Sequence, residues 1–293
     1  MGRAGENSWA PKGMYWSDLQ TTASHNNIRA MSLAFKPGSY KWLHGGEEIF
    51  PALLAAIDGA QKTVRLEVYF YANDELGRGF RDALVKAQLR GLSVQVLIDS
   101  LGSLGLPANF WEPLAVVGGE ARWFNPDLAK RLGFRDHRKI LVCDEEIAFV
   151  GGFNVSEQYQ GDGVKTGWYD LGLRLASPIA VQLAAAFDEM FAQAAFRTRG
   201  VHRHRAVSKR DVTVEDGELL LSGPGRGRNP FTRSLRRDLQ RAKTVQIIAA
   251  YFLPTWRIRH ALMKAARDGG KVQLILPAKS DIMLSQLACR SLY

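Results

Sequence analysis

The sequence predicts an α/β protein built from a repeated unit of alternating helices and strands. Apolar residues recur at helical spacing over 48–60 and 76–90, and strand-like patterns follow at 63–71 and 94–98. Helix and strand alternate in this order, which is typical of an α/β unit. A similar series begins again near residue 243, so one pattern predicts both the fold class and a duplication.

The first unit continues through four further strands and two helices. The expected elements are, in order, a weak helix after Pro113, a strand over 121–124, a hairpin with strands 140–142 and 147–150, a strand over 168–175 and an apolar helix over 179–196. We therefore expect a mixed sheet flanked by helices.

Two short stretches of the first unit return in the second. Segment 243–245 resembles segment 62–64, and segment 269–276 resembles segment 91–98. The offset is about 180 residues in both places, as an internal duplication predicts.

Changes in composition divide the chain into four parts. They are an irregular N-terminal lead-in (1–40), a first repeat (41–196), a basic linker (197–212) and the start of a second repeat (213–293). The linker clusters Arg and His with little apolar content. It is interpreted either as a solvated connection or as a patch that holds anionic phosphate on a membrane or nucleic acid.

The composition predicts a folded protein with a basic surface. Hydrophobic residues make up 46% of the 293 residues, which is ordinary for a globular protein with a core. Lys and Arg number 39 against 29 Asp and Glu, so the formal net charge is +10 at pH 7. Such a surface favours anionic partners, either nucleic acid or acidic phospholipid, and charge alone does not choose between them.

The cysteines and the N-terminus indicate the expected compartment. Cys143 lies in an apolar strand, where a buried thiol is expected, and Cys289 is far from it, so neither a disulfide framework nor a zinc site is predicted. The N-terminus lacks the apolar core of a secretory signal. No apolar run approaches the roughly 18 residues of a spanning helix. We therefore expect a cytoplasmic protein, peripheral on the inner face of the cell membrane.

His137 and Lys139 are the most informative pair of polar residues. In an extended strand, residues two apart point to the same face, so the imidazole and the ammonium project together. A histidine can act as a nucleophile, and a fixed cation can hold a phosphate oxygen. Taken alone, a His-x-Lys pair is more often a solvated strand face, so the neighbouring residues decide between the two interpretations.

Four further residues follow this pair at fixed spacing. Asp144 lies in the polar break between the two hairpin strands, and Gly151 and Gly152 come just before Asn154. The glycines allow a close backbone approach or a sharp turn, which would bring Asn154 near the strand end. Together with the His-x-Lys pair, these residues suit work on a phosphate group.

The string His-x-Lys-x4-Asp followed by Gly-Gly-x-Asn resembles the signature of the phospholipase D superfamily. Segments 137–144, 147–154 and 168–178 are similar to the bacterial cardiolipin synthases within it. The resemblance implies a phospholipase D-like duplicated αβ sandwich, in which two such motifs face one phosphodiester. One histidine would form a covalent phosphohistidine, and the other would protonate the leaving alcohol. The resemblance implies no metal and no other cofactor.

The resemblance also assigns roles to single residues. His137 would be the nucleophile or the acid, and Lys139 and Asn154 would bind phosphate oxygens. Asp144 would complete the catalytic motif, chiefly as an anchor of the hairpin. Asp170 matches the place of a carboxylate that fixes the tautomer of the motif histidine, with a strand-end cap as the simpler alternative.

The second half of such a site has no counterpart in the printed sequence. The repeat offset places a partner for His137 at about residue 315, whereas the sequence ends at Tyr293. We therefore expect the second repeat to be incomplete here. The other half-site would come from a missing C-terminal segment or from a second chain.

These observations favour a metal-independent phosphatidyltransferase of the cardiolipin synthase type, acting on phosphatidylglycerol or a related phospholipid. The alternatives are a phospholipase D-type phosphodiesterase or nuclease, which uses water as the acceptor, and a catalytically incomplete fragment that binds anionic lipid. Nucleic acid is the less favoured partner.

Trp256, Arg257 and Arg259 could contact lipid, although core and plain surface positions are equally compatible with them. Glu67 interrupts an apolar strand and could line the site, but a buried structural role is favoured.

Overall fold

The structure of the protein is a computed structural model, which describes residues 40–126, 135–176, 178–195, 211–214, 217–221, 230–276 and 287–289. The predicted lead-in, except for its last residue, and most of the predicted basic linker lie outside the described residues.

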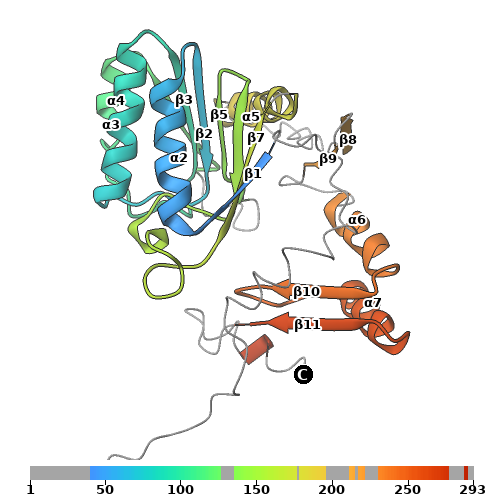
Figure 1. The fold of residues 1–293 in the computed structure, drawn as a ribbon. Coiled ribbons are helices and arrows are strands. Elements are labelled where there is room, and N and C mark those ends of the chain that lie inside the picture. Colours follow the sequence, from blue (N-terminus) through green and yellow to red (C-terminus); the bar gives the residue numbers. More distant parts are fainter. Residues whose placement is uncertain are drawn as a thin grey trace, which may run out of the picture.

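A seven-stranded mixed sheet forms the centre of the first part of the chain (Figure 1). Its strands are β1 (Tyr40–His44), β2 (Thr63–Val68), β3 (Ser93–Asp99), β4 (Glu120–Phe124), β5 (Ile140–Cys143), β6 (Ile147–Gly151) and β7 (Leu171–Ala176). Their spatial order is β1-β7-β6-β5-β2-β3-β4. Strands β2, β3 and β4 are parallel, whereas β5, β6, β7 and β1 join through antiparallel pairs. The predicted α/β class with a mixed sheet is confirmed.

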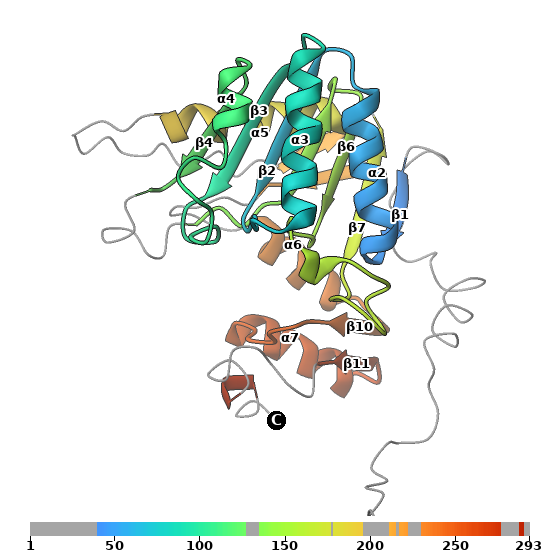
Figure 2. The same cartoon turned by 90° about the vertical axis from the view of Figure 1, so that its left-hand side faces the viewer.

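Helices cover both faces of this sheet (Figures 1 and 2). Helices α2 (Gly45–Gly59), α3 (Glu75–Leu89) and α4 (Glu112–Val116) lie on one face, and α5 (Ile179–Ala195) lies on the other. The alternation of β5 explains how one strand serves both layers. Leu141 and Cys143 pack into the core under α2 and α3, whereas Ile140 and Val142 pack against α5.

Cys143 is buried and has a free thiol, as its apolar strand predicted. Burial raises the pKa of this thiol to about 12. The side chain therefore behaves as a small apolar group of the core.

Two predicted strands differ from the structure at the ends next to the motif. The strand expected over 63–71 ends at Val68, because the Phe70 N–H donates to the Asn154 side chain instead of a sheet neighbour. The strand expected from residue 168 begins at Leu171, because the Trp168 N–H donates to the Gln158 carbonyl. Both ends are diverted into loops on the motif side of the sheet.

The remaining described residues form two smaller sheets. A hairpin of β8 (Asp211–Val214) and β9 (Gly217–Leu220) is followed by α6 (Pro230–Leu239), β10 (Thr244–Ile248), α7 (Trp256–Arg267) and β11 (Lys271–Ile275). Strands β10 and β11 are parallel, as β2 and β3 are. The series α6–β10–α7–β11 thus has the same order and strand pairing as α2–β2–α3–β3. The proposed division of the chain into domains remains a prediction.

Within the residues that the structure describes, no helix combines the length and the apolar character that crossing a membrane requires.

Candidate active site

The segment before β5 carries the two motif residues that the structure brings together. The Lys139 Nζ lies 3.3 Å from the His137 Nδ1 and donates a hydrogen bond to the His137 carbonyl at 2.9 Å. The ring of Tyr69, just beyond the end of β2, lies 4.6 Å from the imidazole and 5.3 Å from the ammonium, measured from the Tyr69 centroid. An imidazole and a cation are therefore held against one aromatic surface.

The electrostatic environment of this pair suits a nucleophile beside a cation. Partial burial, followed by the nearby Lys139 charge, lowers the pKa of His137 from its usual 6.5. Burial lowers the pKa of Lys139 to about 8, although Asp136 and Asp170 oppose this effect. His137 is therefore largely neutral at neutral pH, while Lys139 retains most of its charge. A bound phosphate would raise the pKa of Lys139 again by direct charge attraction.

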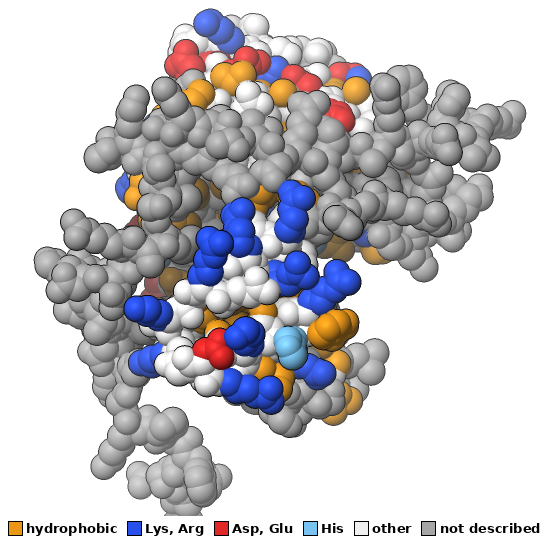
Figure 3. All heavy atoms as spheres, turned by 90° about the vertical axis from the view of Figure 1, so that its right-hand side faces the viewer, with side chains coloured by type: hydrophobic (Ala, Val, Ile, Leu, Met, Phe, Trp, Pro, Cys, Tyr) orange, Lys and Arg blue, Asp and Glu red, His pale blue; other side chains and the backbone are white. Residues whose placement is uncertain are grey.

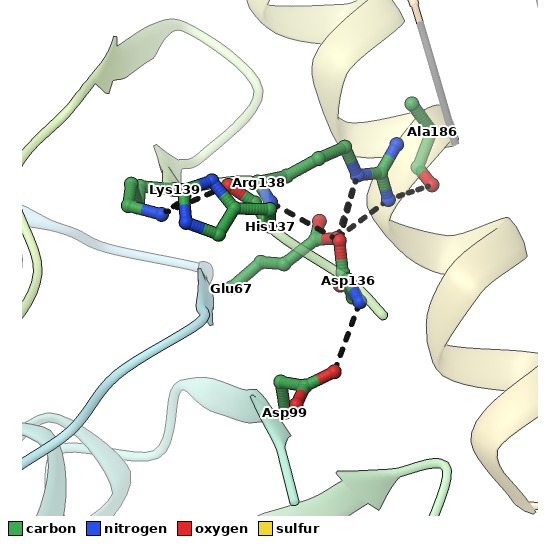
Figure 4. Close-up of polar contacts among 7 residues, drawn as sticks. All are labelled: Glu67, Asp99, Asp136, His137, Arg138, Lys139 and Ala186. Carbon is green, nitrogen blue, oxygen red and sulfur yellow. Dashed lines mark hydrogen bonds and ion pairs between the residues drawn. The ribbon is translucent and has the colours of Figure 1, made fainter. Parts of the chain in front are cut away.

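The alternate residues of the same segment point inward (Figure 4). Asp99, at the end of β3, is fully buried and accepts a hydrogen bond from the Asp136 N–H at 2.9 Å. Arg138 donates from Nε to Glu67 in β2 at 2.7 Å and from Nη2 to the Ala186 carbonyl in α5 at 3.2 Å. The segment that carries His137 and Lys139 is thus tied to two strands and a helix.

Glu67 occupies the structural position that was favoured for it. Its side chain is fully buried and ion-pairs with Arg138. Burial, reinforced by the negative charge of Asp136, raises the pKa of Glu67 well above its usual value, although Arg138 opposes the shift. This carboxyl group therefore supports the motif segment from inside the sheet.

Asp99, Asp136, Arg138 and Tyr69 were not among the predicted site residues. A signal for Asp99 was available, since it ends an otherwise apolar strand. The alternation that placed His137 and Lys139 outward also implies that Asp136 and Arg138 point inward. Their partners lie far away in sequence, which no local pattern reveals.

Asp144 lies in the β5–β6 turn and binds three backbone N–H groups. Its carboxylate accepts from Gln61, Lys62 and Thr63 at 2.8, 2.7 and 2.8 Å. Burial opposes ionisation here, but these hydrogen bonds outweigh it and lower the pKa of Asp144. The contacts are those of an anchor for the hairpin. A direct catalytic part for Asp144 remains a prediction.

Replacing Asp144 with alanine is expected to lower the free energy of unfolding by about 1–3 kcal/mol, because three charge-assisted hydrogen bonds to the backbone are lost. Asp144 also has a positive φ of 57°, which asparagine tolerates better than alanine. Asp144→Asn should therefore lose less, and urea unfolding at pH 7 compares the two. The contribution of the carboxylate is present above its unfolded pKa and disappears as the pH falls through the lower folded value. Equal losses in both variants would contradict this account.

Asn154 lies beside the motif, but its amide is engaged within the protein. Its Oδ1 accepts from the Phe70 N–H at 3.1 Å, and its Nδ2 donates to the Tyr159 hydroxyl at 2.6 Å. Only 5% of the residue is exposed. These contacts fix the loop after β6 against the end of β2. Phosphate binding by Asn154 remains a prediction.

The two glycines allow close packing around Asp170. A Cβ on Gly152 would overlap the Asp170 carboxylate, and one on Gly151 would lie 2.6 Å from the Leu171 carbonyl. Asp170 accepts from the Leu171 N–H at 2.8 Å, which is the strand-end cap considered as the alternative. Within the described residues it makes no hydrogen bond to His137, and its charge acts on Lys139 instead. Burial raises the pKa of Asp170, and its action on the His137 tautomer remains a prediction.

Potential metal ligands do not gather near the motif or elsewhere in the described ranges. Among these residues, no three His, Cys, Asp or Glu side chains converge as a metal site requires.

A nucleophile-capable histidine and a lysine, held at the entrance to a hairpin in a mixed αβ sheet, define the class of protein. Residues 53–194 match the family model described as the phospholipase D-like domain of cardiolipin synthase. The chain is therefore a member of the phospholipase D superfamily, which confirms the family that its motif indicated.

Within that superfamily, the chain is similar to bacterial cardiolipin synthases. It is 32% identical over 258 residues to cardiolipin synthase B of Salmonella typhimurium, covering 86% of this chain and 62% of the relative. It is 31% identical over 266 residues to cardiolipin synthase 1 of Bacillus anthracis, covering 86% and 52%. The chain thus spans only part of the length of these relatives.

A solved structure supports the fold over the same extent. The crystal structure of phosphatidylserine synthase from Haemophilus influenzae matches with a TM-score of 0.65 and 16% identity, covering 86% of this chain and 66% of that one. At this identity the match shows the fold alone. It confirms the predicted αβ architecture.

Proposed function

We propose that this chain supplies one half of the active site of a metal-independent phosphatidyltransferase of the cardiolipin synthase type. Its donor would be phosphatidylglycerol or a related phospholipid. The observation that carries the proposal is the exposed His137 beside Lys139, backed by the buried network of Asp99, Asp136 and Arg138. The similarity to named cardiolipin synthases supports a phospholipid donor over nucleic acid.

In the proposed first step, an imidazole nitrogen of His137 attacks phosphorus. A P–N bond forms while the P–O bond to the leaving alcohol breaks, and the alcohol takes a proton from an acid in the other half-site. Lys139 holds a non-bridging oxygen and balances its charge. In the second step an acceptor alcohol gives its proton to the same group of the other half-site and attacks phosphorus, and the P–N bond breaks to free His137.

The other half-site would come from a C-terminal continuation or from a second chain. The protein would act at the inner face of the cell membrane as a peripheral enzyme. Asn154 would contact the phosphate after a local change of its hydrogen bonds, and Asp170 would act through Lys139 as well as through the histidine.

The test uses a donor whose leaving group needs no acid. A phosphatidyl ester of p-nitrophenol, labelled in its phosphatidyl group, is mixed with the chain in detergent micelles. We expect a burst of p-nitrophenolate and label on the protein that is labile to acid and stable to base, because p-nitrophenolate leaves without the second half-site. His137→Ala should lose both signals, whereas His25→Ala, which changes a histidine outside the motif, should keep them.

Label that persists in His137→Ala, or a folded wild-type chain that takes up none, would contradict the proposal. The product then separates the alternatives. Cardiolipin formed from added phosphatidylglycerol indicates a transferase, whereas phosphatidic acid indicates that water is the acceptor. Label from a p-nitrophenyl nucleotide ester in preference to the lipid ester would favour a nuclease.

A further inference from the structure

Helices α6 and α7 present a strongly basic surface. Residues 230–276 contain ten Lys and Arg but only two Asp. Figure 3 shows blue side chains gathered over this part of the molecule, with orange side chains among them. The exposed cations on these elements and their connections are Arg233, Arg236, Arg237, Arg241, Lys243, Arg257, Arg259, Lys264, Arg267 and Lys271. Most of the formal net charge of the chain is therefore concentrated in this segment.

The outer face of α7 combines cations with exposed apolar side chains. Its inner face is formed by the buried residues Ile258, Ala261, Leu262 and Ala265. On the opposite face Trp256 is 68% exposed and Met263 is 43% exposed, and they lie among Arg259 and Arg267. Exposed apolar side chains that are grouped with cations in this way are typical of surfaces that bind a membrane.

Helix α3 shows that the fold does not require this charge. It precedes β3 in the parallel β2–β3 pair, just as α7 precedes β11 in the parallel β10–β11 pair. Helix α3 carries three basic and two acidic residues, whereas α7 carries four basic and no acidic residues. Equivalent packing is thus reached with balanced charge, and the cationic face of α7 is a separate property.

We propose that the outer face of α6 and α7 docks onto the surface of an anionic lipid bilayer. Trp256 and Met263 enter the headgroup region, and the surrounding arginines contact lipid phosphates. Basic helices with exposed aromatic and apolar side chains bind membrane interfaces by this combination of forces. The proposal rests on the proposed function, because a donor phospholipid would be presented in such a bilayer.

Charge reversal on α7 tests the docking face. Arg259→Glu/Arg267→Glu changes the local charge by four, and one charge near an anionic surface is worth about a fivefold change in binding. Four such charges multiply to a large effect, so we expect this variant to bind phosphatidylglycerol-containing vesicles about 600-fold more weakly than the wild-type chain in co-sedimentation. The matched control is Arg78→Glu/Lys86→Glu on α3, which makes the same change in net charge and should stay within about threefold.

A second variant separates the apolar contribution from the charge. Trp256→Ala/Met263→Ala keeps every cation and should weaken binding severalfold, with the loss persisting at high salt, where electrostatic attraction is screened. Circular dichroism checks that each variant is folded. Vesicles of phosphatidylcholine alone should bind the wild-type chain at least tenfold more weakly than anionic vesicles.

Three outcomes would overturn the docking face. They are equal losses in the α7 and α3 variants, no binding of the wild-type chain to anionic vesicles, and tighter binding to an oligonucleotide, which displaces the vesicles. The labelling of His137 in micelles reports the proposed function separately. If the chain binds vesicles but His137 is not labelled, the proposed function is refuted and the docking face is retained. If His137 is labelled but the α7 variant binds vesicles as well as the wild-type chain, the docking face is refuted and the proposed function is retained.

Discussion

Replacing Arg138 with methionine is expected to lower the free energy of unfolding by about 3–5 kcal/mol, because it leaves buried carboxyl groups without their cation. Arg138 donates to Glu67 and to the Ala186 carbonyl, and its Nε lies 3.6 Å from Asp136. Both acidic residues are almost fully buried. Urea unfolding at pH 7 measures the loss.

The control for this prediction is Lys264→Met, which removes a surface ion pair. Lys264 contacts Asp268 at 2.6 Å, and the two side chains are 56% and 58% exposed. Exposed pairs of this kind contribute about 0–1 kcal/mol. If Arg138→Met cost no more than Lys264→Met, the buried network would not stabilise the motif segment.

The pH dependence of stability gives a second readout of the same network. Because the pKa of Glu67 is raised in the folded chain, the folded state keeps a proton that the unfolded state releases. Stability therefore falls as the pH rises from the ordinary glutamate pKa towards the raised value. Glu67→Gln cannot release this proton, so its stability should decline less over the same range.

The network also shows where prediction from the sequence ends. Alternation along a strand is local, so the spacing of His137 and Lys139 was enough to place them on one face. Arg138 and Glu67 are 71 residues apart, and Asp136 and Asp99 are 37 apart. Side chains this far apart in sequence meet only because β2, β3 and β5 are neighbours in the folded sheet, and a local sequence pattern does not reveal that strand order. The sequence therefore predicted the outward pair but not its buried support.

The same limit applies to Asn154 and Asp170. The glycines before Asn154 predicted a close backbone approach, and the packing of Gly152 against Asp170 is such an approach. The direction of the two polar side chains depends on distant partners. Asn154 bridges the Phe70 N–H and Tyr159, and Asp170 caps its own strand at Leu171. The motif resemblance names these residues, but the contacts decide what each holds in place.

Replacing Lys139 with methionine is expected to slow the transfer of the phosphatidyl group to His137 by about 100- to 1,000-fold. The reason is that a preorganised cation no longer balances the charge that develops on phosphate. The rate of p-nitrophenolate release in the burst measures this step. Lys86→Met, which changes an exposed lysine on α3, is the control and should leave the rate unchanged.

The pH dependence of that rate should identify Lys139 individually. For kcat/KM, which reports groups of the free enzyme, the rate should rise as His137 loses its proton, at a pH below the usual histidine value of 6.5. It should fall as Lys139 loses its proton near pH 8. Arginine stays protonated far above this range. The Lys139→Arg variant should therefore react more slowly than the wild-type chain, because its geometry differs, but its kcat/KM should not fall near pH 8. An alkaline decline that persists in Lys139→Arg would assign that ionisation to another group and remove Lys139 from the phosphate site.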